Sequence, residues 1–451
     1  MKKLIFTLVL SSIALLTHAQ VTALYGNGTS GYRTSGNAAD SVNCAFTAPY
    51  GASYDSKGNL WITDQGNNFI VMIYANNKTY QLREGYTLGG FTDGASVGQF
   101  GGVTYAPSGI VVVRGKTSAN DQIYICDAGN NAIRKVDSFI NPGYAQYMHT
   151  LSGGGTKVQG LPGQSGYVNG TAKKSLFKNP AGIGYIKDAS GGYLVVADMG
   201  NNAIRKVSLH KADSGTTSDI NTTIQGPQGI FIDYSNNIYV ASPLNNQGIM
   251  KVSSTTGSAT TVVPGMYLGG PSSLVIRRTD MYIADGCRIM DFDMTKPASA
   301  SNPSVYAGNV PDTLCDFRDG SNKSAWFNGI ALMTISPDSS YLVVADQGNN
   351  RFRKVMLPTL HTVGVENAVA PAGSFNVYPN PASGHISINS NISGNSVISL
   401  FTITGKQVMS KAVMMNANEP YELVLGNQPA GVYVLQISSA GGVSTQKIML
   451  Q

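Results

Sequence analysis

An all-β fold is the class that this sequence predicts. Glycine is abundant, with 52 residues, and tyrosine stands at 23. Both suit turns and pleated strands. Glutamate, a strong helix former, occurs only four times in 451 residues. The last observation is a short phrase, Asp-x-Gly-Asn-Asn, that recurs at 64–68, 127–131, 198–202 and 346–350, each time after a β-rich apolar run.

Residues 1–19 have the composition of a secretory signal peptide. Lys2 and Lys3 precede an apolar run, and the segment ends in Thr17-His18-Ala19 with small residues where signal peptidase cleaves. We therefore expect export through the general secretory route and a mature chain starting at Gln20, secreted or held at the outer-membrane surface. Loss of the two lysines takes the formal charge from +6 to +4. That mild charge indicates neither a nucleic acid nor an anionic membrane as partner, and no later stretch is apolar enough to span a membrane.

Six units follow in residues 20–363, and they align on the residue that ends the second apolar run of each. These residues are Asp64, Asp127, Asp198, Ser242 as a degenerate copy, Asp285 and Asp346. Each unit has three such runs, and a fourth comes from the connecting stretch, for example 221–224, 260–263 or 304–306. Four short strands per unit, repeated around a ring, predict a six-bladed β-propeller. The segment Val21–Tyr25 resembles a fourth strand, so we expect it to complete the last unit beside residues 329–355 and remove an exposed edge.

The recurring phrase has a local explanation as framework. Its glycine and asparagines suit the positive φ angles of a tight turn, and the aspartate can accept amide hydrogens of that turn. Arg134, Arg205 and Arg353 follow three of the copies at equal spacing. We expect each arginine to reach an aspartate of its own or the adjacent unit.

The frame around these copies resembles that of the NHL repeat family of β-propellers. It reads Pro-x-Gly-Ile, then Val-Ala-Asp, then Gly-Asn-Asn, then Ile-Arg-Lys-Val, best in the units that end at Val136, Val207 and Val355. The frame is partial in the first unit and weak in the fourth and fifth. The resemblance, which covers residues 46–355, implies a propeller and no single activity.

Loops that enter several units share a second motif: Phe91-Thr-Asp-Gly94, Tyr167-Val-Asn-Gly170 and Phe317-Arg-Asp-Gly320. If strand directions alternate, these connections and the recurring turns fall on one face, which becomes the expected binding surface. Its candidate residues are Tyr50, Tyr105, Asn245, Asn246, Arg288, Trp326 and Asn328. Blades four and five, where the phrase is broken, are the sector in which we expect a feature particular to this protein.

The last part of the chain has a different pattern. After a linker at 364–374, residues 375–451 open with Tyr-Pro-Asn-Pro, continue through Gly-Val-Tyr-Val-Leu and end in Lys-Ile-Met-Leu. They closely resemble the C-terminal sorting domain of the type IX secretion system of Bacteroidetes. The resemblance implies a small β-sandwich and the secretion machinery as a partner.

Four cysteines in an exported chain permit two disulfides: Cys44, Cys126, Cys287 and Cys315. The repeat frame places Cys287 and Cys315 near neighbouring units and favours that pair. No Cys-x-x-Cys spacing exists, so zinc and redox motifs are not indicated.

Catalytic chemistry has little support in the sequence. The exported chain has histidines only at 149, 210, 361 and 385, too few in the ring for a three-histidine zinc site. The single ring glutamate, Glu84, is expected on an outer strand, away from a central calcium site. No nucleophile elbow occurs, and a Gly-x-Gly-x-x-Gly string at 26–31 lacks a following helix. We expect no cofactor, with a structural calcium as the alternative.

The sequence thus predicts a binding module for a protein or glycan ligand. A lyase or lactonase with a metal in the central channel is the alternative. A structural role in a surface layer also stays open.

Overall fold

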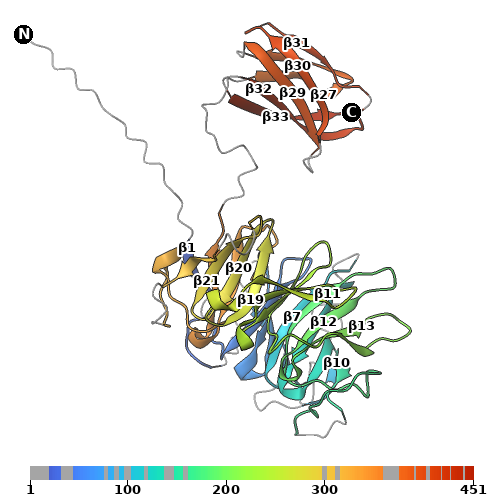
Figure 1. Cartoon of the computed structure of the whole chain (residues 1–451), viewed down its shortest axis with the longest axis vertical. Coiled ribbons are helices and arrows are strands. Elements are labelled where there is room, and N and C mark those ends of the chain that lie inside the picture. Colours follow the sequence, from blue (N-terminus) through green and yellow to red (C-terminus); the bar gives the residue numbers. More distant parts are fainter. Residues whose placement is uncertain are drawn as a thin grey trace, which may run out of the picture. The chain divides into compact units, whose positions relative to one another are not determined.

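The computed structural model describes residues 20–31, 44–75, 80–85, 91–95, 103–115, 120–136, 147–155, 161–296, 302–309, 315–358, 375–390, 393–402, 407–417, 419–426, 428–439 and 442–451. The expected signal peptide (1–19) and linker (364–374) lie outside this part. The chain divides into two compact units, Met1–Thr359 and Leu360–Gln451. Both consist of strands (Figure 1).

Six antiparallel sheets make up the described part of the first unit, and we number them one to six. Sheet one contains β2 (Pro49–Tyr54), β3 (Leu60–Asp64), β4 (Phe69–Ile73) and β5 (Tyr80–Gly85). Sheet two contains β7 (Pro107–Val113), β8 (Gln122–Asp127), β9 (Ala132–Val136), β10 (Tyr147–Gly153) and the short β6 (Gly94–Ala95). Sheet three contains β11 (Pro180–Ile186), β12 (Tyr193–Asp198), β13 (Ala203–Ser208) and β14 (Thr217–Asn221).

Sheet four contains β15 (Ile230–Ile232), β16 (Ile238–Ser242), β17 (Gly248–Val252) and β18 (Ala259–Val263). Sheet five contains β19 (Pro271–Arg277), β20 (Asp280–Asp285), β21 (Arg288–Asp293) and β22 (Ser304–Gly308). Sheet six contains β24 (Ile330–Ile335), β25 (Tyr341–Asp346), β26 (Arg351–Met356), β1 (Gln20–Tyr25) and β23 (Gly320–Ser321). Short 3-10 turns connect strands: η2 (Gln65–Asn67), η4 (Ala128–Asn130), η5 (Met199–Asn201), η6 (Leu244–Asn246), η7 (Gly265–Tyr267), η8 (Asn322–Ser324) and η9 (Gln347–Asn349).

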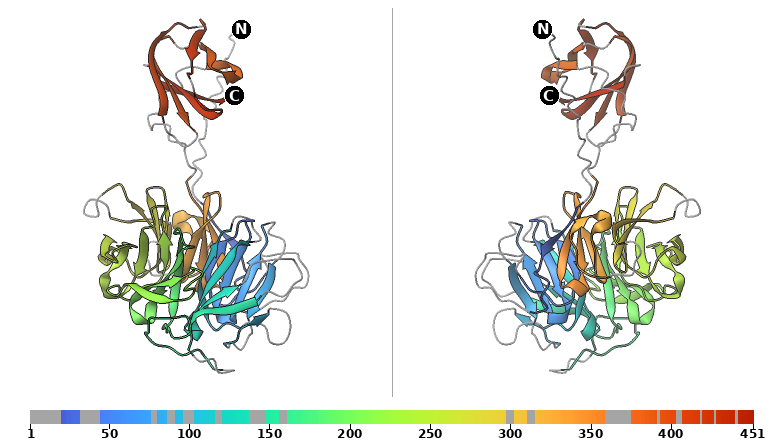
Figure 2. Two further views of the ribbon diagram at one scale, coloured as in Figure 1. Left: turned by 90° about the vertical axis from the view of Figure 1, so that its right-hand side faces the viewer. Right: turned by 90° about the vertical axis from the view of Figure 1, so that its left-hand side faces the viewer.

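The sheets follow one another around a closed ring (Figure 2). The first strands β2, β7, β11, β15, β19 and β24 each contact the next, and β24 contacts β2. Each sheet therefore has a neighbour on both faces. This explains why the middle strands are apolar on both sides: every residue of β12 and β16 is buried. The core consists of separate apolar clusters, such as the one that Val195 and Val240 form between sheets three and four.

The N-terminal strand closes the ring. β1 pairs antiparallel with β26, with Val21 opposite Val355, and Val21 is fully buried. The predicted closure by residues 21–25 is confirmed. The predicted outer strand at 221–224 was wrong in position, because the fourth strand of sheet three is β14 and ends at Asn221.

First strands come so close that only glycine fits at some positions. A Cβ atom on Gly182 of β11 would lie 2.1 Å from the carbonyl oxygen of Gln228, at the start of sheet four. Serine completes the contact elsewhere, since Ser108 Oγ donates to the Pro180 carbonyl at 2.7 Å. Small residues in the Pro-x-Gly-Ile frame thus allow the backbones of neighbouring sheets to meet.

The second unit is a β domain with two layers of strands. β27 (Phe375–Ser383), β28 (His385–Ser390) and β31 (Tyr421–Val424) form one layer, and β29 (Gly394–Thr402), β30 (Gln407–Met415), β32 (Gly431–Ser439) and β33 (Gly442–Leu450) form the other. β27 joins them, since it pairs with β28 at Phe375 and with β33 at Ala382. A single apolar cluster, which includes Ile388 and Leu435, is shared by both layers.

We expect Gly182→Ala to destabilise the ring, because the added methyl group must displace the backbone of sheet four. Overpacking of this kind costs about 1–3 kcal/mol. Gly270→Ala is the matched control, since a Cβ there meets no atom within 4 Å. Thermal unfolding of the two variants should show a clear loss for the first and little change for the second. Equal melting temperatures would contradict the close-contact account.

Candidate functional site

Four turns of the ring share one conformation. In each, a strand ends at an aspartate, a 3-10 turn follows, and the final asparagine is left-handed. These asparagines are Asn68 (φ 61°), Asn131 (φ 52°), Asn202 (φ 54°) and Asn350 (φ 52°). Asparagine tolerates this region better than most residues. We call the side of the ring that carries these turns, η6 and η7 the hairpin face.

The aspartate of each turn binds the segment that leads into its own sheet. In sheet two, Asp127 Oδ1 accepts the Tyr105 backbone N–H at 2.8 Å, and Gly129 N–H donates to the Tyr105 carbonyl at 2.8 Å. A Cβ on Gly129 would lie 2.7 Å from that carbonyl oxygen, which explains the glycine of the phrase. The same two bonds recur between Asp64 or Gly66 and Thr47, between Asp198 or Gly200 and Lys178, and between Asp346 or Gly348 and Asn328.

The left-handed asparagine links its sheet to the next one. Asn131 Oδ1 accepts the Asn179 N–H of the segment leading into sheet three, at 2.9 Å. Equivalent bonds run from Asn350 to Ala48, from Asn68 to Ala106 and from Asn202 to Gly226. Four of the six joints around the ring therefore use the same side-chain amide.

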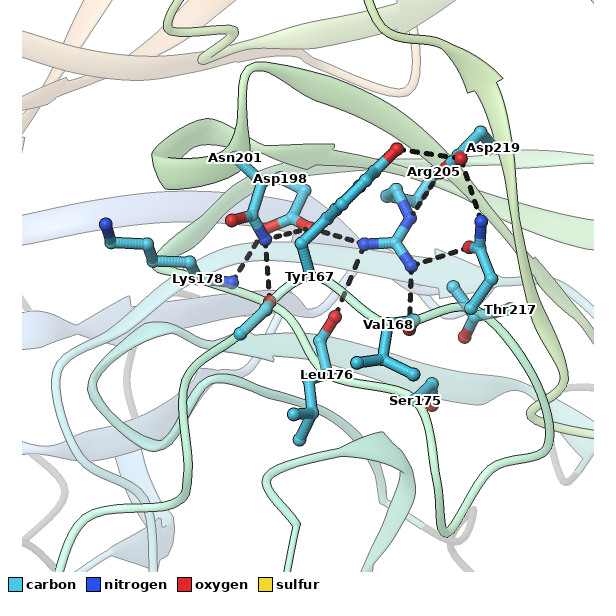
Figure 3. Close-up of polar contacts among 12 residues, drawn as sticks. Tyr167, Val168, Ser175, Leu176, Lys178, Asp198, Asn201, Arg205, Thr217 and Asp219 are labelled. Atoms are coloured by element: carbon cyan, nitrogen blue, oxygen red, sulfur yellow. Dashed lines mark hydrogen bonds and ion pairs between the residues drawn. The ribbon is translucent and has the colours of Figure 1, made fainter.

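A buried arginine completes the network in sheets two, three and six. Figure 3 shows Arg205, whose Nη1 lies 2.7 Å from Asp198 Oδ2 and whose Nη2 donates to the Val168 carbonyl at 3.0 Å and to Asn169 Oδ1 at 2.7 Å. Its side chain is fully buried. Arg134 and Arg353 make the corresponding contacts with Asp127 and Asp346, and with the loops at 91–94 and 317–320.

Each of these arginines faces two carboxylates. Arg134 pairs with Asp93 as well as Asp127, and Arg353 pairs with Asp319 in the same way. In sheet three the loop has Asn169 instead. The second carboxylate there comes from the outer strand β14, where Asp219 lies 2.9 Å from Arg205 Nε.

Aromatic rings cover the guanidinium groups. The Arg205 guanidinium lies 4.8 Å from the Tyr167 ring centroid and 5.1 Å from that of Phe177. Arg353 lies over Phe317 and Phe327 in the same manner. Stacking on aromatic faces suits the weakly hydrated guanidinium. The Asp-x-Gly-Asn-Asn phrase and the aromatic loop motif are therefore parts of one buried arginine network, which we call the anchor.

Sheet one has the buried aspartate without the arginine. Val71 occupies the position seven residues after Asp64, and Asp64 is 1% exposed. Its oxygens accept hydrogen bonds from the Thr47 N–H and from Asn67 Nδ2. Burial raises the pKa of Asp64 to about 7, and those two hydrogen bonds only partly offset the effect.

Sheets four and five depart from the common turn. In sheet four, Ser242 replaces the aspartate, and its hydroxyl donates to the Gln225 carbonyl at 2.6 Å while Gln247 Oε1 accepts the Gln225 N–H. In sheet five, Asp285 accepts two backbone N–H groups and pairs with Arg288 at 2.9 Å.

A disulfide replaces the amide link between sheets five and six. Cys287 of the sheet-five turn is bonded to Cys315, in the segment that leads into sheet six. The sequence-favoured pair is therefore present. Cys44 and Cys126 are both buried and are not disulfide-bonded.

The predicted binding residues fall into separate groups. Asn245 and Asn246 lie on η6, which contacts η7. Gly269, two residues after the end of η7, lies beside Arg288. These three predicted residues share the sector of sheets four and five. Two exposed apolar residues lie there as well: Leu244, at 53%, next to the predicted asparagines, and Met266, at 69%, which sequence reasoning missed. Lone apolar residues in short loops give no sequence signal.

The other predicted residues belong to the framework of other sheets. Tyr50 packs beside the apolar cluster of sheets six and one, and burial raises its pKa to about 12. The Trp326 carbonyl accepts Arg353 Nη1 at 2.9 Å. Tyr105 and Asn328 give their backbone groups to the turns, and the Tyr105 side chain is 41% exposed.

Within the described ranges, no group of three or more His, Cys, Asp or Glu side chains is arranged to hold a metal ion. No described helix has the length and apolar character to cross a membrane.

Comparison with known proteins identifies the last part of the chain. Residues 376–451 match the family model described as secretion system C-terminal sorting domain. The protein is thus exported to the cell surface or secreted, and it engages the secretion machinery through this domain. No curated protein sequence matches the chain.

Solved structures support the fold of the first part. A protein of unknown function from Bacteroides thetaiotaomicron VPI-5482 is 12% identical with a TM-score of 0.52, covering 75% of this chain and 76% of its own. A phosphatase candidate from the same strain is 13% identical with a TM-score of 0.51, at 75% and 79% coverage. At such identities the likeness shows a propeller-like fold alone.

We expect loss of Arg205 to be costly, because Asp198 would be left buried without its cation. Breaking a buried pair in this way costs about 3–5 kcal/mol. Arg205→Met should lower the free energy of unfolding by that order, and Arg205→Met combined with Asp198→Asn should recover part of it. Denaturant unfolding checks both. A double variant less stable than Arg205→Met would contradict the ion-pair account.

Asp64 should make stability fall as pH rises toward neutrality, the opposite sense to an aspartate whose folded-state pKa is lowered. Its folded pKa is raised from 3.8 to about 7, so the folded state holds the proton more tightly than the unfolded state. The free energy of unfolding should fall as pH rises from about 4 to above 7. Asp64→Asn should remove the part of this dependence that Asp64 contributes. A gain from Asp64→Asn that is equal at pH 5 and pH 8 would show that Asp64 does not titrate in this range.

Proposed function

We propose that the first unit is a six-bladed propeller of the NHL type that binds a protein or glycan ligand through its hairpin face. The six sheets in ring order and the shared turn support the repeat assignment. We further propose a signal peptide at 1–19, a propeller at 20–363, a linker at 364–374 and a sorting domain at 375–451. The last of these delivers the propeller outside the cell.

The observation that carries the binding proposal is a contrast between asparagines. In the four repeated turns, the last asparagine is used in an inter-sheet hydrogen bond. The Asn245 and Asn246 side chains are exposed and make no hydrogen bond within the described part of the chain. Both residues are nonetheless left-handed, with φ of 52° and 58°. Their amide groups are available to a ligand.

Exposed apolar side chains lie on the same two turns. Leu244 and Met266 project from η6 and η7, which contact each other. Binding sites typically combine apolar contact area with a few polar groups that fix orientation. The hairpin face of sheets four and five has both.

A pair of aspartate substitutions on opposite faces tests this assignment. Leu244→Asp places a charge in the proposed surface, and Tyr234→Asp places one on the exposed β15–β16 turn at the other end of sheet four. We expect the purified chain to retain a ligand on a mixed protein and glycan array. Retention should be lost with Leu244→Asp and kept with Tyr234→Asp. Equal retention by both variants would reject the hairpin face.

A further inference from the structure

The framework uses backbone groups at the positions that lead into each sheet and leaves the side chains there to vary. The segments contribute N–H and carbonyl groups to the turns in sheets one, two, three and six. The residues concerned are Thr47, Tyr105, Lys178 and Asn328. The hairpin face can therefore present different side chains at equivalent positions without altering the joint below.

Acidic groups of the framework are withdrawn from this face. The side chains that end the second strands are at most 1% exposed, and backbone and amide donors satisfy them. They are Asp64, Asp127, Asp198, Asp285 and Asp346. Among the described residues, these five carboxylates are therefore not available to a cationic partner.

The sector of sheets four and five carries almost no charge. Its segments 223–229, 243–247 and 264–270 read TIQGPQG, PLNNQ and PGMYLGG, without a charged residue. Arg288, at the border, is 20% exposed on its side chain and is neutralised by Asp285 at 2.9 Å. Electrostatic complementarity, which steers charged protein partners, has no basis here.

The exposed polar side chains of η6 are the amides of Asn245 and Asn246. Each asparagine side chain has two N–H donors and an acceptor oxygen, which match neighbouring hydroxyl groups that both donate and accept. Leu244 and Met266 offer apolar area to the C–H faces of a sugar ring. Close packing holds the groups in place, since a Cβ on Gly265 of η7 would lie 2.4 Å from the Asn246 carbonyl carbon.

We propose that the η6–η7 sector binds a neutral carbohydrate, with Asn245 and Asn246 as its hydrogen-bonding residues. The inference rests on the proposed binding function and specifies its ligand class. The closely packed backbone of the turn fixes where the two amide side chains start, so binding orders only the side chains themselves. The surface has no cationic side chain to pair with the negative charges of uronic-acid and sulfated glycans, so it favours neutral glycans over them.

Glycine substitutions test the proposal without straining the backbone, because glycine accepts positive φ. The test variant is Asn245→Gly with Asn246→Gly. The matched control is Asn236→Gly, an exposed left-handed asparagine (φ 61°) on the β15–β16 turn. The full chain is screened on an array of neutral glucans and mannans beside uronic-acid-containing and sulfated glycans. The best neutral oligosaccharide is then titrated calorimetrically.

We expect neutral glycans to bind, the double variant to lose about tenfold or more in affinity, and the control to stay within about twofold. Loss of two hydrogen bonds of about 1 kcal/mol each gives an effect of this size. Preference for anionic glycans, or neutral binding that the double variant leaves unchanged, would overturn the proposal. If a protein ligand is lost with Leu244→Asp while no neutral glycan binds, the carbohydrate assignment fails and the binding function stands. If neither Leu244→Asp nor Tyr234→Asp changes the retention of any ligand, both the carbohydrate assignment and the binding function of the hairpin face fail.

Discussion

A carboxylate buried at the end of the second strand is the constraint on which the ring depends. In sheet two it is Asp127, which must find donors without water. The donors are the N–H of the segment leading into the sheet, the amide of Asn130 and the guanidinium of Arg134. Satisfying one acid group therefore fixes a turn, a loop and a strand at once. This explains why the phrase recurs with so little variation.

The arginine extends the same constraint outward. A buried guanidinium needs acceptors for its Nη N–H groups, which the loop carbonyls supply, and a second carboxylate lies within ion-pair distance of it. In sheet two this carboxylate belongs to a loop residue, Asp93, and in sheet three it belongs to a strand residue, Asp219. In both sheets the arginine has a second carboxylate beside it, although different structural elements provide that carboxylate.

The sequence allowed some of these features to be predicted and not others. The pairing of an arginine with the aspartate seven residues earlier follows from one turn, so local reasoning could suggest it. The loop motif at 91–94 was visible as a repeat, but its role required knowing that it folds back beside β10, next to β9. In sheet three the loop position holds Asn169, and the second carboxylate comes from Asp219 on β14. This could not be foreseen, because it depends on which strand lies beside the guanidinium. The candidate ligand residues stay predictions: Tyr50 was chosen for its aromatic ring and packs beside an apolar cluster, and Trp326 contributes its backbone carbonyl to Arg353, which the sequence could not indicate.

We infer the function from the turn in which the left-handed asparagine does not make the hydrogen bond between sheets. Asn131 and Asn246 have the same left-handed backbone, and only the first has its amide used between sheets. The most direct measurement of this difference is the melting temperature of Asn131→Gly and Asn246→Gly, compared in the full chain. We predict a clear loss for Asn131→Gly, which removes bonds to the Asn179 N–H and the Gly163 carbonyl, and almost none for Asn246→Gly. Equal losses would show that the sheet-four asparagine is also framework and would contradict the account.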